Sequence, residues 1–117
     1  MTRPALLLVV GLAAGCGWVP ADEQVLTTFF EQSRLYDTTR VAAVARVIFD
    51  PRVEGVVERY RVTARNDQPL DGRRLRRQSV LAARVRTVGR EYDRLLQVTM
   101  ERDADGRWMV VGYRWTS

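Results

Sequence analysis

Few residues in this chain of 117 could carry chemistry, because the sequence has no histidine, no lysine and a single cysteine, Cys16. A lone cysteine cannot form a disulfide within the chain. Without histidine, the chain can build neither a Cys/His zinc site nor a Ser-His-Asp or Cys-His nucleophile pair. The sequence therefore predicts a protein that is not an enzyme, holds no metal, needs no cofactor and acts by binding.

Arginine supplies all 19 basic residues, and seven arginines fall in a stretch without Asp or Glu. The seven are Arg73, Arg74, Arg76, Arg77, Arg84, Arg86 and Arg90. Guanidinium groups bind phosphates and carboxylates through paired hydrogen bonds, so the run could contact anionic lipid or an anionic polymer. The alternative is an ordinary solvated surface, in which Glu91, Asp93 and Glu101 pair with these arginines across strands. Nucleic acid is not expected as a partner, because no motif that reads DNA or RNA is present.

The beginning of the chain has the order of a secretory signal peptide over residues 1–15: Arg3, an apolar run, and small residues at its end. The apolar run over residues 5–15 would reach about 16 Å as a helix, which is too short for a bilayer of roughly 30 Å. Residues 12–16, Leu-Ala-Ala-Gly-Cys, resemble the lipobox of bacterial lipoproteins, with alanine where that family prefers leucine three residues before the cysteine.

The lipobox resemblance implies cleavage before Cys16 and acylation of its sulfur by fatty acids such as palmitate. Two or three acyl chains hold a protein firmly on a membrane. We therefore expect export and lipid anchoring in the cell envelope, with residues 16–20 as a short tether to a domain over 21–117. Gly17 after the cysteine favours the periplasmic face of the outer membrane if the source is Gram-negative. Another envelope protein is a further candidate partner.

The composition, with 46% hydrophobic and 28% charged residues, suits one globular domain. Residues 21–36 are predicted to form a helix, because Leu26, Phe29 and Phe30 share one face with Tyr36. A second helix is predicted over residues 40–47, capped by Asp37 and stopped by a proline. Its predicted buried residues are Val41, Val44, Ala45 and Ile48.

Alternating polar and apolar residues predict four antiparallel strands after the helices. Their ranges are 55–64, 78–88, 94–102 and 107–116, with a loop at 65–72, a turn region at 89–93 and a hairpin turn at 103–106. Apolar residues occupy both faces of the last strand, with Trp108 on one face and Tyr113 and Trp115 on the other. Such a strand is expected to be central in the sheet or covered on both sides. Phe29 and Trp108 are expected to share one core.

Three features combine in the predicted domain: an opening helix with the pair Phe29-Phe30, a break at Tyr36-Asp37, and a closing segment in which Gly106 leads into a strand beginning with tryptophan. Together they resemble the NTF2-like (cystatin-like) superfamily. The resemblance implies an α+β fold in which two N-terminal helices pack on one face of a curved four-stranded antiparallel sheet. Another small α+β sandwich is the alternative.

Domains of this superfamily resemble a cone whose mouth can hold a ligand or active site, and the resemblance makes Tyr36, Glu58 and Tyr60 candidate pocket residues. A carboxylate in an apolar pocket would have a raised pKa and could act as a base. The alternative function is thus an NTF2-like pocket protein that binds or transforms a small ligand. A deep, partly polar cavity between helix and sheet would favour that alternative, whereas a filled core with an exposed apolar or basic patch would favour a binding module.

Overall fold

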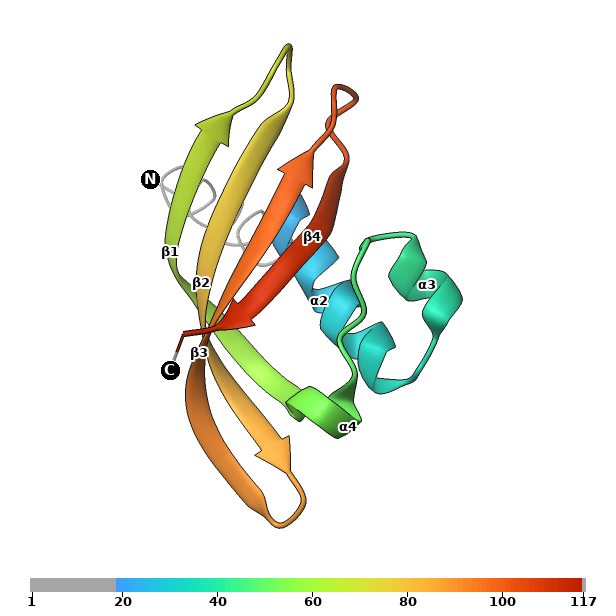
Figure 1. The fold of residues 1–117 in the computed structure, drawn as a ribbon, viewed down its shortest axis with the longest axis vertical. Helices are drawn as coiled ribbons and strands as arrows, with labels where there is room; N and C mark the ends of the chain where they lie inside the picture. Colours follow the sequence, from blue (N-terminus) through green and yellow to red (C-terminus); the bar gives the residue numbers. More distant parts are fainter. Residues whose placement is uncertain (1–18, 117) are drawn as a thin grey trace, which may run out of the picture.

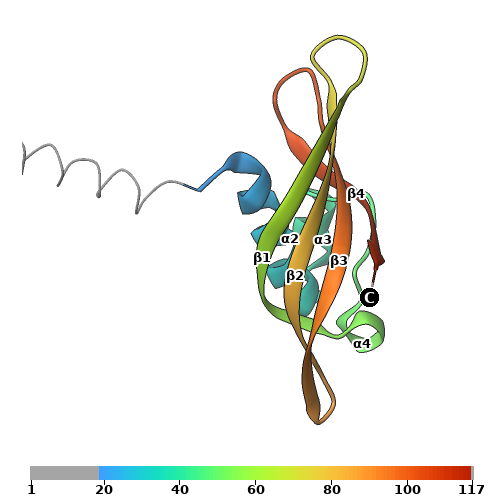
Figure 2. The ribbon, with the colours of Figure 1, turned by 90° about the vertical axis from the view of Figure 1, so that its left-hand side faces the viewer.

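The computed structural model describes residues 19–116, which form an α+β domain with a curved, unclosed, four-stranded antiparallel sheet and three helices (Figure 1). The elements in chain order are α2 (Ala21–Arg34), α3 (Thr38–Ala42), α4 (Pro51–Glu54), β1 (Val56–Pro69), β2 (Leu75–Thr87), β3 (Arg90–Arg102) and β4 (Trp108–Trp115). The strands follow one another as a meander in the order β1-β2-β3-β4. The helices all lie against one face of the sheet, and the other face is uncovered within the described residues (Figure 2).

Helix α2 begins after Pro20, and two acids in its first turn suit the positive end of the helix dipole. It ends at Arg34, two residues before the predicted end. The backbone N–H groups of Tyr36 and Asp37 donate to the carbonyls of Ser33 and Gln32, which is the Schellman arrangement that closes a helix. The predicted face is correct for Leu26, Phe29 and Phe30, which are buried, but Tyr36 lies beyond the helix and is 55% exposed.

The second predicted helix is wrong in its length and its end. Asp37 does cap α3, since its side chain accepts a hydrogen bond from the backbone of Arg40 at 3.0 Å. The helix stops at Ala42 because the following segment instead bonds to β4: Val110 N–H donates to Val44, and Arg46 N–H donates to Val110, both at 2.8 Å. Ile48, predicted to be buried, is 76% exposed.

Pro51 was expected to stop a helix and instead begins one. Proline is favoured in the first turn of a helix, where its missing N–H costs no hydrogen bond. The side chain of Asp50 caps α4 by accepting from the backbone N–H of Arg52 at 3.0 Å. Gly55 then turns the chain into β1 with a φ of 90° and lies so close to Val85 that a Cβ atom would collide with it.

The strands are longer than predicted, because the hairpins keep their pairing almost to the turns. β1 continues through residues 65–69, which were expected to be loop, and β2 begins at Leu75 instead of residue 78. β3 begins at Arg90, so the predicted turn at 89–93 is mostly strand. The hairpin turn predicted at 103–106 is confirmed, with Asp103 accepting from the backbone of Asp105 and Arg107 at 2.9 Å.

The predicted faces of β4 are wrong because the strand is irregular. Register shifts mark a bulge between the pairs Thr99–Gly112 and Met100–Val110. The extra residue returns the later side chains to the helix-covered face, so Tyr113 and Trp115 join Trp108 there. β4 is also an edge strand, not a central one, and the short bridge from Ala45 covers part of its free edge.

The hydrophobic core lies between α2 and the sheet. It contains Phe29, which is fully buried, and Trp108, which is 7% exposed, so the expectation that they share one core is confirmed. Inward-facing residues of β2 and β3 complete it, among them Leu81, Leu96 and Val98. The pattern of burial in β2 alternates as the strand prediction requires.

Candidate functional site

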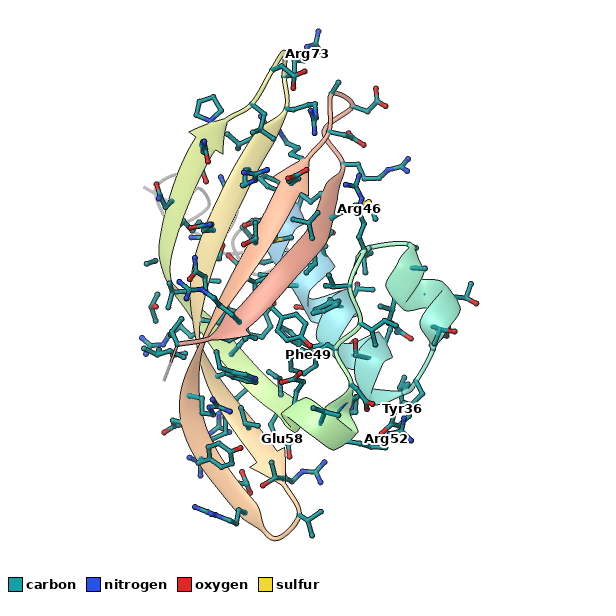
Figure 3. The ribbon with its side chains drawn as sticks, in the orientation of Figure 1. Tyr36, Arg46, Phe49, Arg52, Glu58 and Arg73 are labelled. Carbon is teal, nitrogen blue, oxygen red and sulfur yellow. The ribbon has the colours of Figure 1, made fainter. Side chains whose placement is uncertain are left out.

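Aromatic side chains fill the space between α2 and the sheet. Phe49 is at the centre of this cluster, with its ring centroid 5.0 Å from that of Tyr113 and 5.4 Å from that of Phe30. Phe29 and Trp115 lie within 6.2 Å of the same ring. Figure 3 shows Phe49 directed from its segment toward the sheet. The interior of the fold is therefore packed core.

The sequence pattern missed two residues that close this interior. Phe49 was overlooked because a helix through residue 47 would have buried Ile48 instead. Glu54, at the end of α4, accepts hydrogen bonds from the Tyr113 hydroxyl at 3.0 Å and from the Trp115 indole at 2.8 Å. Burial and the bond to Glu54 raise the pKa of Tyr113 to about 12. These contacts hold α4 on the sheet.

A cavity of about 360 Å³ borders this core, between the end of α2, α3 and the segment that leads to α4. Ligand pockets commonly have volumes of about 300–1,000 Å³ and mostly apolar walls. The wall of this cavity is formed largely by apolar side chains. Its lining residues are Ser33, Tyr36, Thr38, Val41, Ala42, Ala45, Arg46, Val47, Ile48, Phe49, Asp50, Pro51 and Arg52.

Tyr36 lines this cavity in a backbone conformation that bulky residues rarely adopt. Its φ is 57°, in the left-handed region. Among the described residues, no other non-glycine residue has a positive φ. Glycine is the usual residue at this position of a Schellman motif. The ring lies beneath the guanidinium of Arg52, with the Arg52 Cζ atom 5.4 Å from the ring centroid. The two labelled side chains lie together in Figure 3.

Exposed apolar residues lie in the segments that form the cavity: Tyr36 and Ile48 line it, and Leu35 and Val53 are next to lining residues in the sequence. Leu35, Tyr36, Ile48 and Val53 are 64%, 55%, 76% and 76% exposed. Contiguous exposed apolar surface bordered by polar residues is typical of interaction sites. We name these four residues and the cavity beside them the α2-end surface.

One polar group in the wall of the cavity lacks a partner. Ser33 is 6% exposed, and its hydroxyl has no hydrogen-bond partner within residues 19–116. Buried hydroxyl groups normally form at least one hydrogen bond.

The structure does not bring the three candidate pocket residues together. Tyr36 belongs to the α2-end surface, whereas Glu58 and Tyr60 line a different, shallow cleft beside α2. The Tyr60 hydroxyl bonds Thr27 at 2.7 Å and the carbonyl of Glu23 at 3.1 Å, and burial raises its pKa. Glu58 pairs with Arg86. These contacts tie β1 to α2 and to β2.

The structure distributes the seven arginines of the run over both faces of the sheet and both ends of the molecule. Arg84 and Arg76 lie on the uncovered face, and Arg77 lies on the helix-covered face. Arg73 stands at the tip of the β1–β2 loop, far from Tyr36 and Arg52 (Figure 3).

Five of these arginines form ion pairs. Three of the pairs are Arg84 with Asp93 at 3.3 Å, Arg76 with Glu101 at 3.0 Å, and Arg74 with Asp71 at 2.8 Å. Arg84 also pairs with Glu91 at 3.5 Å and Arg74 with Glu101 at 3.7 Å. The other pairs are Arg86 with Glu58, and Arg77 with Asp67 at 2.7 Å and Asp22 at 3.0 Å. Of the seven arginines of the run, only Arg73 and Arg90 form no ion pair within residues 19–116, so only these two could meet an anion without losing one.

Asp22 is a further residue whose environment the sequence did not predict. Asp22 lies in the first turn of α2 and is 3% exposed, and its carboxylate pairs with Arg77 at 3.0 Å and with Arg65 at 3.6 Å. Arg77 also stacks on Trp108, with its Cζ atom 4.7 Å from the ring centroid. This network fastens the beginning of α2 to the sheet.

Cys16 and the predicted signal peptide lie outside the described residues. Among residues 19–116, no helix is long and apolar enough to cross a membrane, and no three acidic, histidine or cysteine side chains gather as metal ligands would. No family model, curated protein or solved structure matches the chain.

Proposed function

We propose that the chain is an exported lipoprotein, anchored in the cell envelope through acylated Cys16, whose single NTF2-like domain is a non-catalytic binding module. Its partners are the membrane and another envelope component, not nucleic acid. In a Gram-negative source it would face the periplasm from the outer membrane. The lipobox-like residues 12–16 support the anchor, and the curved sheet with helices on one face is compatible with the NTF2-like fold.

The filled interior is the observation that carries the binding role. An enzyme or small-ligand protein of the cone type needs an open interior. Here, Phe49 and Tyr113 occupy that space with ring centroids 5.0 Å apart. The apolar cavity instead opens at the side of the domain, next to exposed Ile48. This arrangement favours recognition of a partner over conversion of a substrate, and it disfavours the small-ligand alternative.

Labelling with a radioactive fatty acid in cells tests the anchor. Wild-type chain should carry label and sediment with the envelope membranes. Cys16→Ser should carry no label, because serine lacks the thiol that accepts the lipid, and should leave the membrane fraction or remain unprocessed. Gly17→Ala keeps the cysteine and serves as the matched control. Equal labelling of wild type and Cys16→Ser would disprove the lipoprotein proposal.

A further inference from the structure

We propose that the α2-end surface docks a segment of a partner protein that inserts one bulky apolar side chain into the cavity and carries acidic residues beside it. This inference rests on the proposed role as a binding module and names the partner's chemistry. Large apolar side chains held in pockets dominate the affinity of many protein interfaces. A cavity of about 360 Å³ has room for such a side chain.

The apolar surface extends beyond the cavity, which favours a protein over a small ligand. Leu35 and Val53 are 64% and 76% exposed and are not part of the cavity lining. A small molecule inside the cavity would leave both in water. A protein segment lying across the mouth would cover them together with Ile48.

The charges around the cavity identify the flanking residues of that segment. The cavity lining contains Arg46, Arg52 and Asp50, a net charge of +1, and Asp37 lies beside the lining residue Tyr36 in the sequence. Both aspartates are engaged as helix caps, Asp37 with the backbone of Arg40 and Asp50 with that of Arg52. Arg34 and Arg46 form no ion pair within residues 19–116, so carboxylates of a partner would meet unneutralised guanidinium groups.

The strained backbone of Tyr36 is an independent sign of function at the same place. Residues in sparsely populated conformations cluster at binding sites, and an observed outlier supports a functional hypothesis. Glycine would fit the φ of 57° without strain, but it would remove the ring that lies beneath Arg52. We therefore assign the ring of Tyr36 to contact with the partner.

The position of the surface along α2 suits a membrane-anchored protein. The tether from Cys16 leads to the beginning of α2, and the cavity lies at the end of this 14-residue helix. A helix of that length is about 21 Å long. The cavity therefore lies about one helix length from the first residue of α2, at the end of α2 that is farther along the chain from the proposed anchor.

The test is a selection of random 12-residue peptides on the full-length chain held in neutral phosphatidylcholine nanodiscs. Enriched peptides should share a bulky apolar residue within three positions of Asp or Glu. Ile48→Ser and Tyr36→Gly should each weaken binding at least fivefold, because both remove apolar contact at the mouth. Arg46→Gln should weaken it about threefold and reduce its dependence on salt.

Matched controls separate this surface from the rest of the molecule. Val88, at the β2–β3 turn, is fully exposed, and Arg73 is an exposed cation on the opposite end, so Val88→Ser and Arg73→Gln should bind like wild type. The proposal is overturned if no peptide is enriched, if enriched peptides are basic, or if Ile48→Ser binds them equally well. Self-association lost in Ile48→Ser would also overturn it, in favour of a second copy. None of these results depends on fatty-acid labelling, so failure here is distinct from failure of the anchor.

Discussion

Replacing Tyr36 with glycine should change the stability of the domain by no more than about 1 kcal/mol, although it removes a whole aromatic ring. A non-glycine residue in the left-handed region costs roughly 1–2 kcal/mol, and Tyr36 has a φ of 57°. Glycine removes that strain. Two losses oppose the gain: the exposed contact with Arg52 contributes about 0.5–1 kcal/mol, and glycine gives the unfolded chain extra entropy. Glycine's entropy costs about 0.5–1 kcal/mol, so the two losses together come to about 1–2 kcal/mol and the expected net change lies within about 1 kcal/mol of zero.

Urea and thermal unfolding followed by circular dichroism measure this change. A gain of 1 kcal/mol would raise the melting temperature by about 4–8 °C in a domain of this size. Tyr36→Ala is the matched control, because it removes the ring but keeps the strained Cβ, and it should be about 1 kcal/mol less stable than Tyr36→Gly. If Tyr36→Gly loses more than about 1 kcal/mol, the ring stabilises the fold and its assignment to a partner is refuted.

Further outcomes follow from the core and the charged contacts. Phe49→Ala should lower the free energy of unfolding by about 3–5 kcal/mol, because the residue is 3% exposed and packs against four rings. A loss below about 1 kcal/mol in urea unfolding would contradict the packed interior. Absorbance titration should show a tyrosine step near pH 12 that disappears in Tyr113→Phe. Because the folded pKa of Tyr113 exceeds its unfolded value of about 10, the unfolded chain loses this proton first, and stability should fall as pH rises from 10 to 12. Arg77→Gln leaves buried Asp22 with Arg65, at 3.6 Å, as its one ion-pair partner within residues 19–116, and should lower stability by about 1–3 kcal/mol. Arg73→Gln should change stability by less than about 0.5 kcal/mol. Equal effects of the two substitutions would refute the network at the beginning of α2.

The parts of the fold that local patterns control could be predicted from the sequence. The face of α2 that holds Leu26 and Phe29, the cap at Asp37 and the turn at 103–106 depend on neighbouring residues, and each agrees with the structure. The order of helices before an antiparallel meander followed from the same signals. The NTF2-like assignment remains a prediction.

The parts that depend on distant contacts could not be predicted. The segment after α3 leaves its helix to bond Val110, some 65 residues later in the chain, and that exchange buries Phe49 in place of Ile48. The bulge in β4 moves Tyr113 to the inner face, which strict alternation cannot anticipate. The pairs that neutralise Arg84 and Arg76 depend on strand register.

The cavity itself was only partly predictable. Tyr36 was a candidate pocket residue by resemblance, but Glu58 and Tyr60 proved to lie elsewhere, because the cavity is built from the irregular segment over residues 43–50. The helical spacing of Val41, Val44 and Ile48 instead predicted a helix through this segment, because a local pattern cannot show the backbone bonds to Val110. The break at Tyr36-Asp37 was the one local signal of the site.

Site-specific photocrosslinking in living cells tests the central claim that the α2-end surface meets another protein. A photoreactive phenylalanine derivative is placed at Ile48 or, as the control, at Val88, both of which are exposed and should tolerate it. The account predicts a light-dependent adduct from Ile48 to a different protein, through a peptide with acidic residues beside the crosslink, and none from Val88. No adduct from Ile48, or the same adduct from both positions, would contradict it.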